Sequence, residues 1–322
     1  MMIYAESLFI SPVHSGEGFK GSKGSKNSNV KRQVNPPEIN LDKCTSCGLC
    51  LEVCPAFVLE MANEKAAVAR GDWCIGCGQC GTVCPVEAIL PPGTAHKECS
   101  QPGTGPAIFS EALQLLFRER RSVRRYTDKP IPREILEKIL EAGRFAPTGR
   151  NSQNVNYIVL TSVDQIKTLR EMMATFFEKI VSRVRRPVGS LVLSLVAGRK
   201  LVESLRESLP KVEYAKKAME QGKDPLFYHA PVVMLVHAES WDTCSAFNCS
   251  IALYNGSLMA HTLGIGCCFN GYLANAANHD RKIKAWLGIP KDHQCYAAMT
   301  LGYQKVKYQR LPDREPLKVT WR

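Results

Sequence analysis

The periodicity of apolar residues predicts several helices in the region that follows residue 107. Residues 108–120 have helical periodicity. Residues 133–143 place apolar side chains every three or four positions after a proline that suits a first turn. Residues 163–220 are typical of several helices with basic faces. Residues 243–263 contain no Asp, Glu, Lys or Arg, so this helix is expected to be buried on nearly all sides.

Three shorter runs in the same region predict buried strands. Residues 155–161, 231–237 and 295–303 are rich in β-branched and aromatic side chains. These strands are separated by the predicted helices, and this order favours a sheet covered by helices. The fold class is therefore expected to be α+β.

The first third of the chain is organised differently. Residues 1–39 include a stretch rich in Gly, Ser and Lys, which predicts a flexible basic tail. Residues 40–92 hold two cysteine-rich runs, and the Pro- and Gly-rich residues 93–107 predict a linker. Residues 108–322 are then expected to form a second, larger domain.

Charge is unevenly distributed along the 322 residues, whose formal net charge is +12. Residues 41–100 hold four Lys or Arg against seven Asp or Glu, whereas residues 101–322 carry a net charge of +13. A basic surface attracts anionic partners such as a phosphorylated cofactor or an acidic redox protein. Nucleic acid is not expected as a partner, because the chain has no nucleic-acid-binding motif and no aromatic–basic interleaving.

The sequence predicts neither a membrane span nor a secretory signal. The apolar run 188–198 is too short to cross a bilayer, and the uncharged region 243–279 is interrupted by Asn, Ser, Gly and His. The N-terminus lacks a basic start before its apolar residues and carries Glu6. We therefore expect a cytoplasmic protein without a membrane partner.

The most specific signal is the spacing of eight cysteines. Residues 44–55 read CTSCGLCLEVCP, and residues 74–85 repeat the pattern as CIGCGQCGTVCP. Three thiols at this spacing can converge on three irons of a cubic cluster, while the fourth thiol, before a proline, reaches the other cluster. We expect two 4Fe-4S clusters. One would be held by Cys44, Cys47, Cys50 and Cys84, and the other by Cys74, Cys77, Cys80 and Cys54.

Zinc sites and disulfides explain these runs less well. Zinc usually takes two pairs of ligands that are separated by a longer loop. Disulfides fit neither the missing secretory signal nor the further cysteines elsewhere in the chain. Residues 41–92 resemble the bacterial-type ferredoxins that carry two clusters.

Three stretches of the larger domain carry side chains suited to a cofactor. RERRSVRRYTDKPIP (118–132) surrounds Ser122 with arginines that suit a phosphate, or forms a solvated basic helix end. APTGRNSQN (146–154) is a turn whose amide side chains could bind ribityl hydroxyls or a flavin edge. LGIGCCFNGYL (263–273) exposes backbone N–H groups, or is only a tight turn between a helix and a strand.

In this order and spacing, the three stretches resemble the FMN-dependent nitroreductase family over residues 108–322. The resemblance implies an α/β/α sandwich with a central mixed, mainly antiparallel sheet. It also implies an interlocked homodimer with FMN at the interface.

The same resemblance implies which residues contact FMN. The Arg-rich stretch would hold the phosphate and ribityl chain, the amide-rich turn would lie near the flavin, and the backbone amide near Gly271 would face flavin N5. A basic residue near the C-terminus would close on the phosphate. The implied residues are Arg120, Arg121, Ser122, Arg124, Pro147, Thr148, Asn151, Ser152, Gln153, Asn270, Gly271 and Arg310.

Two departures from the family pattern concern the flavin face. Asn154-Val155 stands where the family has Pro-Trp, and Phe269-Asn270-Gly271 stands where it has aromatic-Ile-Gly. Both departures leave the choice of substrate open.

Together, the two resemblances imply an iron–sulfur flavoprotein oxidoreductase. Electrons from reduced ferredoxin, flavodoxin or NAD(P)H would pass through the clusters to FMN and on to a small electrophile such as a nitroaromatic or a quinone. No catalytic side chain is expected, because the flavin carries out the redox chemistry. The alternatives are a redox-responsive electron-transfer or sensor protein without small-molecule turnover, and a dehalogenase or ene reductase of the same fold.

Overall fold

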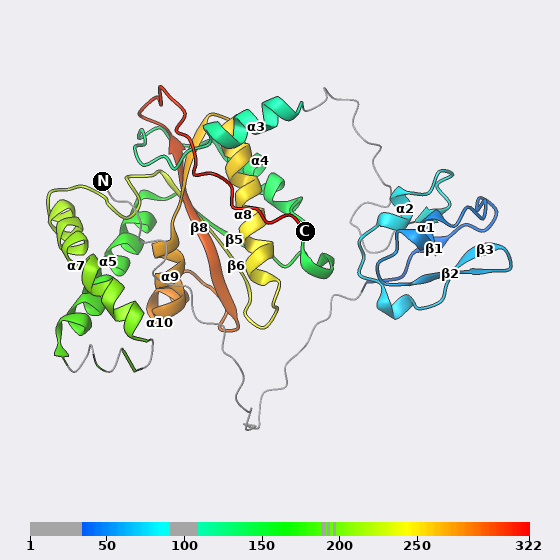
Figure 1. Ribbon diagram of the computed structural model, residues 1–322, viewed down its shortest axis with the longest axis horizontal. Helices are drawn as coiled ribbons and strands as arrows, with labels where there is room; N and C mark the ends of the chain where they lie inside the picture. Colours follow the sequence, from blue (N-terminus) through cyan, green and yellow to red (C-terminus); the bar gives the residue numbers. More distant parts are fainter. Residues whose placement is uncertain (1–33, 91–108, 188–190, 192–193, 196–197) are drawn as a thin grey trace. The chain divides into compact units, whose positions relative to one another are not determined.

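The computed structural model describes residues 34–90, 109–187, 191, 194–195 and 198–322. Residues 1–33 of the expected tail and the whole expected linker lie outside the described residues. The chain divides into two compact units (Figure 1). The described part of the cysteine-rich unit is residues 34–90 together with Thr148–Gln153. The large unit contains the other described residues.

The cysteine-rich unit is built from two copies of one short pattern. Strand β1 pairs antiparallel with β4, and β2 pairs antiparallel with β3. A single-turn helix contains the third cysteine of each run, Cys50 in α1 and Cys80 in α2. The elements are β1 Glu38–Ile39, α1 Leu49–Glu52, β2 Leu59–Ala62, β3 Lys65–Val68, the 3-10 turn Gly71–Trp73, α2 Gln79–Thr82 and β4 Ile89–Leu90.

The backbone repeats as closely as the sequence does. Gly48 precedes α1 with a φ of 76°, and Gly78 precedes α2 with a φ of 75°. These left-handed conformations favour glycine, which has no Cβ to clash. Val58 and Ala88 occupy equivalent positions in the two halves and are both almost fully buried. The duplication seen in the sequence is therefore a duplication of structure.

The large unit is a four-stranded sheet with helices on both faces (Figure 1). The strand order is β5-β6-β8-β7, and each neighbouring pair is antiparallel. The predicted α+β fold with a mainly antiparallel central sheet is confirmed. Its strands are β5 Asn156–Leu160, β6 Val232–Glu239, β7 Ile265–Phe269 and β8 His293–Tyr303. Its helices are α3 Ser110–Glu119, α4 Arg133–Arg144, α5 Val163–Arg185, α7 Arg199–Glu220, α8 Ser245–Thr262, α9 Gly271–His279 and α10 Arg281–Trp286.

Strand β6 separates two apolar cores. Its residues from Val232 to Ala238 are all buried, as expected for a central strand covered on both faces. Val233 and Leu235 pack with residues of α5, α9 and α10. Met234 and Val236 point to the other face and pack with residues of α4 and α8. The period of two along a strand thus assigns alternate side chains to the two helical layers.

Within a single chain, the structure qualifies two expectations for the region 243–273. The uncharged helix, α8, is not buried on nearly all sides, because Phe247 is 72% exposed and Ile251 and Tyr254 are exposed beside it. These residues recur at helical spacing on the side that faces away from the sheet. The Gly-rich stretch that follows is not merely a turn, since residues 265–269 form the edge strand β7.

An extended segment, residues 120–127, runs beside β7 and β8. Ser122 forms a parallel bridge with Cys267, and the Val123 N–H donates to the Cys267 carbonyl at 2.9 Å. Two glycines allow this approach. A Cβ on Gly266 would lie 2.8 Å from Val123 Cγ2, and one on Gly302 would lie 2.7 Å from Tyr126 Cδ1.

Within the described residues, no helix is both long and apolar enough to cross a membrane.

Gly302→Ala is expected to destabilise the large unit by about 1–3 kcal/mol, because the added methyl group has to displace the buried Tyr126 ring. The measurement is the free energy of unfolding in urea. Gln294→Ala, at an exposed position of the same strand, is the matched control and should change it by less than about 0.5 kcal/mol. Equal effects of the two variants would contradict this account of the glycine.

Candidate functional site

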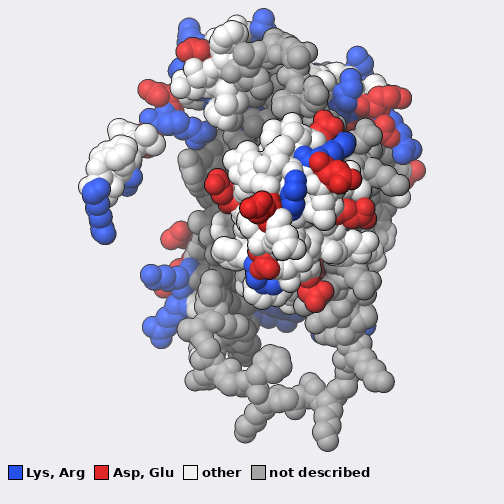
Figure 2. Space-filling view, turned by 90° about the vertical axis from the view of Figure 1, so that its right-hand side faces the viewer, with Lys and Arg blue, Asp and Glu red and all other residues white. Residues whose placement is uncertain are grey.

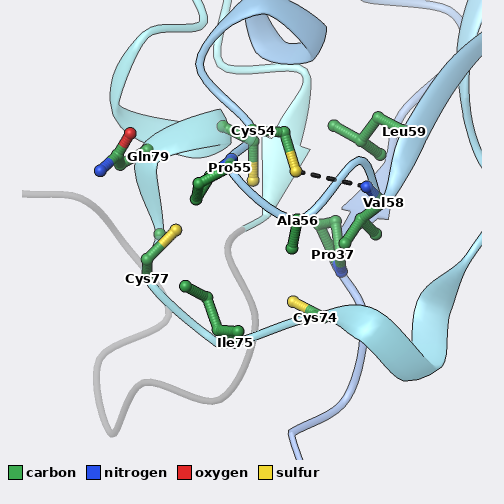
Figure 3. A pocket seen from close by; sticks show the side chains of 12 residues that line it. Pro37, Cys54, Pro55, Ala56, Val58, Leu59, Cys74, Ile75, Cys77 and Gln79 are labelled. Atoms are coloured by element: carbon green, nitrogen blue, oxygen red, sulfur yellow. Dashed lines mark hydrogen bonds between the residues drawn. The ribbon is translucent and has the colours of Figure 1, made fainter. Parts of the chain in front are cut away.

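The cysteines of the two runs surround two pockets in the cysteine-rich unit. Cys54 of the first run lies with Cys74, Cys77 and Cys80 of the second run around one pocket (Figure 3). Cys84 of the second run lies with the first-run thiols Cys44, Cys47 and Cys50 around the other. The structure thus brings together the two sets of four that the spacing predicts, including the exchanged fourth member. Each pocket holds about 340 Å³ of space, part of it open to solvent.

The two exchanged cysteines have equivalent hydrogen bonds. The backbone N–H of Val58 donates to Cys54 Sγ at 3.4 Å, and the backbone N–H of Ala88 donates to Cys84 Sγ at 3.2 Å. Amide donors to sulfur stabilise a thiolate and tune the potential of a cluster bound to it. Each pocket therefore has one sulfur, Cys54 or Cys84, that comes from the other cysteine run and is oriented by a backbone N–H group.

The thiols differ in their electrostatic surroundings. Backbone N–H groups of Ala66 and Ser46, with a smaller contribution from the Lys65 ammonium group, lower the pKa of Cys44. Lys65 Nζ also donates to the Cys44 carbonyl at 2.5 Å. Burial raises the pKa of Cys80 to about 11, so this thiol must lose its proton when it binds a metal.

The arrangement of the thiols differs from that of a single-metal site. In the part of the chain that the structure describes, no three His, Cys, Asp or Glu side chains converge as ligands of one metal ion. The four thiols of each set instead enclose a space. A cubic cluster, whose irons each take one thiolate, matches such an arrangement better than a zinc ion at a single point.

The acidic side chains of the described cysteine-rich unit lie on its outside. In the face that Figure 2 shows, red acidic side chains are spread over a largely uncharged surface. All Asp and Glu residues in the described range 34–90 are exposed. They are Glu38, Asp42, Glu52, Glu60, Glu64, Asp72 and Glu87. The excess of acidic residues that the sequence shows in this region therefore lies on the surface of the unit.

In the large unit, the extended segment 120–127 presents two of the predicted phosphate-binding arginines. Arg120 Nη1 is buried and has no hydrogen-bond partner among the described residues. A buried donor of this kind is unfavourable unless a ligand or water satisfies it. Arg124 is an exposed residue, and its guanidinium carbon lies 5.9 Å from the centre of the Tyr228 ring. Ser122 is partly exposed between them.

The turn at Asn270-Gly271 leads from β7 into α9. The Asn270 side chain accepts a hydrogen bond from the Leu273 N–H at 3.0 Å and donates to the Leu226 carbonyl at 2.7 Å. A Cβ built on Gly271 would meet no atom within 4 Å. Gly271 is the first residue of the helix, where backbone N–H groups lack intrahelical acceptors. The turn is therefore rigid, polar and open on the side of Gly271.

The amide-rich turn is grouped with the cysteine-rich unit. Thr148–Gln153 pack with the cysteine-rich unit, where Asn151 Nδ2 donates to the Gly76 carbonyl at 2.8 Å. Gln153 is held within the turn, because its N–H donates to Thr148 Oγ1 at 3.0 Å. A flavin contact of these residues and of the adjoining Pro147 stays a prediction. The same holds for Arg121 and for Arg310, which is exposed in the segment after β8.

Asn154 is a structural residue whose partners could not be deduced from the sequence. Its Nδ2 donates to Glu239 Oε2 at 2.8 Å and lies 3.3 Å from Asp242 Oδ2. Its Oδ1 accepts from Asn248 Nδ2 at 3.0 Å. These partners come from β6, the loop after it and α8, and Asp242 and Asn248 are buried. Asn154, which replaces the proline of the family's Pro-Trp, therefore anchors the end of the amide-rich turn through hydrogen bonds.

Cys267 and Cys268 are the two adjacent thiols of the Gly-rich stretch. Both are buried in strand β7, where consecutive side chains point to opposite faces. Burial raises the pKa of Cys267 to about 11, so the reactive thiolate is disfavoured. These cysteines are core residues.

Comparison with known proteins gives two family matches in one chain. Residues 117–303 match the nitroreductase family, and residues 36–85 match the 4Fe-4S dicluster domain. The first match spans more than half of the chain. The chain therefore belongs to the nitroreductase family and is an oxidoreductase with an N-terminal 4Fe-4S dicluster domain.

Several known proteins are similar to this chain. A putative NADH dehydrogenase/NAD(P)H nitroreductase from Archaeoglobus fulgidus is 27% identical over 61% of this chain and 87% of its own length. A 4-nitrobenzoate reductase from Nocardioides sp. is 25% identical over 66% of this chain and 89% of its own. A Bacteroides fragilis nitroreductase structure with bound FMN has a TM-score of 0.48 and 22% identity, over 65% of this chain and 98% of that one.

Asn154→Ala is expected to lower the free energy of unfolding by about 1–3 kcal/mol, because it removes hydrogen bonds that join the turn to the side chains of Glu239 and the buried Asn248. Urea unfolding of the full chain measures the loss. Gln165→Ala, at an exposed position in the first turn of α5, is the control and should have little effect. An unchanged stability of the Asn154 variant would show that the hydrogen-bond network does not anchor the turn.

Proposed function

We propose that this protein is an iron–sulfur flavoprotein reductase. It takes electrons from an external donor into two 4Fe-4S clusters, and it uses FMN to reduce a small electrophile. The observation that carries the proposal is the presence of two four-cysteine pockets with exchanged members in the same chain as a nitroreductase-family unit. A dicluster domain alone only carries electrons, and the second unit supplies a place where they can be used.

The cluster ligands in this proposal are the cysteines of the two pockets. Cys44, Cys47, Cys50 and Cys84 hold one cluster, and Cys54, Cys74, Cys77 and Cys80 hold the other. Bound clusters would supply one-electron transfer. The protein's part is to orient the sulfurs through the N–H groups of Val58 and Ala88 and to place a cation, Lys65, beside Cys44.

The FMN site in this proposal lies between the extended segment and the Asn270-Gly271 turn. The unpartnered Arg120 Nη1 fits an anionic ligand, and Arg124 and Ser122 offer further donors beside it. The first N–H groups of α9 suit an acceptor atom of the flavin ring. Bound FMN would supply the conversion between one-electron and two-electron transfer. Arg121, Pro147, Thr148, Asn151, Gln153 and Arg310 complete the proposed set.

The donor and acceptor classes rest on the family. The relatives whose names mention NAD(P)H nitroreductase and 4-nitrobenzoate reductase support a nicotinamide as donor and a nitroaromatic as acceptor. The dicluster domain supports a second donor, a reduced ferredoxin or flavodoxin. Quinones belong to the same class of small electrophiles. The free thiols of the described cysteines suit the reducing cytoplasm.

A homodimer is part of the proposal. Phe247, Ile251 and Tyr254 form an exposed apolar stripe on α8. No charged residue occurs anywhere in this helix, so a second copy can cover the stripe without burying a charge.

The proposal predicts about eight irons and one FMN per chain when the protein is prepared anaerobically. The measurement is iron, sulfide and flavin content, followed by assay with reduced ferredoxin, flavodoxin, NADH and NADPH as donors and a nitroaromatic or quinone as acceptor. Four irons, or no flavin, would contradict the proposed cofactors. Full loading and complete flavin reduction without turnover of any acceptor would indicate an electron-transfer or sensor protein instead.

The exchange of cysteines predicts a distinctive result from paired substitutions. Cys54→Ala and Cys77→Ala should remove the same cluster, so each single variant and the double variant should retain about four irons. Cys54→Ala combined with Cys47→Ala should remove both clusters, because Cys47 lines the other pocket.

Cys244→Ala is the control for this experiment, since Cys244 lies at the start of α8 and should not alter iron content. A Cys54/Cys47 double variant that keeps four irons would show that each run binds its own cluster without exchange.

A further inference from the structure

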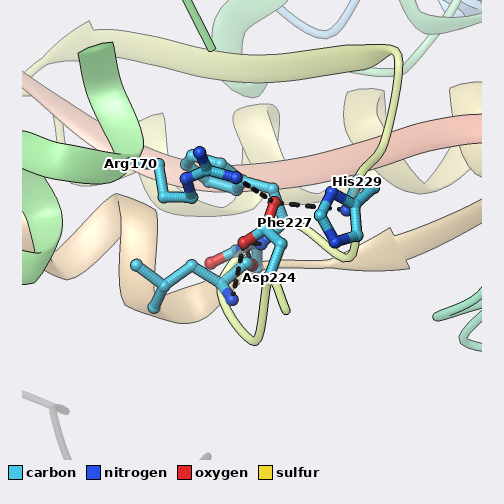
Figure 4. Close-up of polar contacts among 6 residues, drawn as sticks. Arg170, Asp224, Phe227 and His229 are labelled. Atoms are coloured by element: carbon cyan, nitrogen blue, oxygen red, sulfur yellow. Dashed lines mark hydrogen bonds and ion pairs between the residues drawn. The ribbon is translucent and has the colours of Figure 1, made fainter. Parts of the chain in front are cut away.

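The loop from Asp224 to Ala230 is held by one buried carboxylate. The Asp224 side chain is 2% exposed, and its oxygens accept backbone N–H groups of Phe227 at 2.9 Å and His229 at 3.2 Å (Figure 4). Leu226 donates a third N–H at 3.1 Å, and the Arg170 guanidinium lies 3.6 Å from Asp224. A buried charge satisfied in this way makes a short loop rigid.

This rigidity maintains an unfavourable backbone conformation. Tyr228 and His229 are consecutive and have φ values of 59° and 56°, in the left-handed region that favours glycine. Bulky residues remain in this region only where the surroundings force them, and such positions are often found at functional sites. Here the surroundings are the Asp224 hydrogen bonds on both sides of Tyr228.

The loop contacts both segments to which we assign FMN binding. The Leu226 carbonyl accepts the hydrogen bond from Asn270 Nδ2 at the turn before α9. The Tyr228 side chain is hydrogen-bonded to Arg124, whose guanidinium carbon lies 5.9 Å from the centre of the ring. Ala230 packs with Val123 of the extended segment. Neither the sequence motifs nor the family resemblance had assigned this loop a role.

We infer that Tyr228 is a positioning residue that directs Arg124 toward the phosphate of the flavin nucleotide. The phenol oxygen accepts one guanidinium N–H and thereby limits the orientations of a side chain that is otherwise exposed. Arg124 Nη1 also donates to the Ser122 carbonyl at 3.4 Å, which leaves the other guanidinium donors for the phosphate in this proposal. This inference rests on the proposed FMN site.

The protonation state of the phenol agrees with this role. Burial and the neighbouring Cys268 raise the pKa of Tyr228, which outweighs the opposing effect of Arg124. The phenol therefore remains neutral at physiological pH. It orients the arginine without neutralising the positive charge that an anionic phosphate requires.

The inference predicts that Tyr228 matters for the binding of FMN but not for the binding of riboflavin, which has the same ring and ribityl chain but no phosphate. Tyr228→Phe keeps the ring and removes only the oxygen that holds Arg124. We expect FMN to bind about five- to tenfold more weakly to this variant, while riboflavin affinity stays the same, since a hydrogen bond to a charged group has about this value. The ratio of the two dissociation constants, from flavin fluorescence titration of the full chain, is the measurement.

Two further variants show whether the effect passes through Arg124. In an Arg124→Met background, Tyr228→Phe should leave the FMN-to-riboflavin ratio unchanged, because the residue being positioned is gone. Tyr214→Phe, at an exposed position of α7, is the control and should change neither affinity.

Three results would overturn the inference while leaving the FMN site intact. These are an unchanged ratio in Tyr228→Phe, an equal loss for both flavins, and the same change of ratio in the Arg124→Met background. A wild-type protein that binds neither flavin, or binds both equally, would instead refute the proposed phosphate site itself.

Discussion

The pairing of residues 122–127 with the edge of the sheet is the constraint on which the large unit's proposed site depends. The Val123 N–H bonds to the Cys267 carbonyl, and Val123 and Tyr126 are buried against β7 and β8. Burial of these two residues fixes the extended segment, and Ser122 and Arg124, which flank Val123 in the sequence, are left more accessible to solvent. The cationic groups are therefore placed by hydrophobic packing next to them and need not be held by salt bridges. Gly266 and Gly302 make the close approach possible, since any Cβ at these positions would overlap the segment.

The cysteine-rich unit follows a different physical principle. Its described apolar core is small and includes Cys50, Val58, Leu59, Ala66, Ala88 and Ile89, of which Cys50 is itself a proposed ligand. A unit this small gains limited stability from apolar burial, so cluster binding would supply much of its folding free energy. Because Cys54 and Cys84 are exchanged, each cysteine run contributes ligands to both clusters. Loss of one cluster would therefore weaken the half that binds the other.

Much of the architecture could be predicted from local pattern. The apolar runs that became β5, β6 and β8 and the amphipathic helices α4 and α5 had clear periods, and the cysteine spacing specified which thiols meet. The exposed face of α8 could not be predicted. An uncharged helix suits both a core and an interface, and only the position of the sheet shows that Phe247 faces outward. Strand β7 was obscured by Gly266, because glycine is depleted in strands, although the close approach of Val123 leaves no room for a Cβ at this position.

The sequence by itself determined the chemistry that is encoded in spacing: eight thiols in two repeated runs, arginines around Ser122, and a Gly-rich turn at Gly271. Covalent distance limits where such residues can lie, so short motifs carry their own geometry. Tertiary structure alone decided which distant side chains support them. The Asp224 loop reaches Arg124 and Asn270, and Asn154 meets Glu239 and Asn248, across many intervening residues. Such contacts depend on how the helices and strands pack, and no local pattern in a single chain records them.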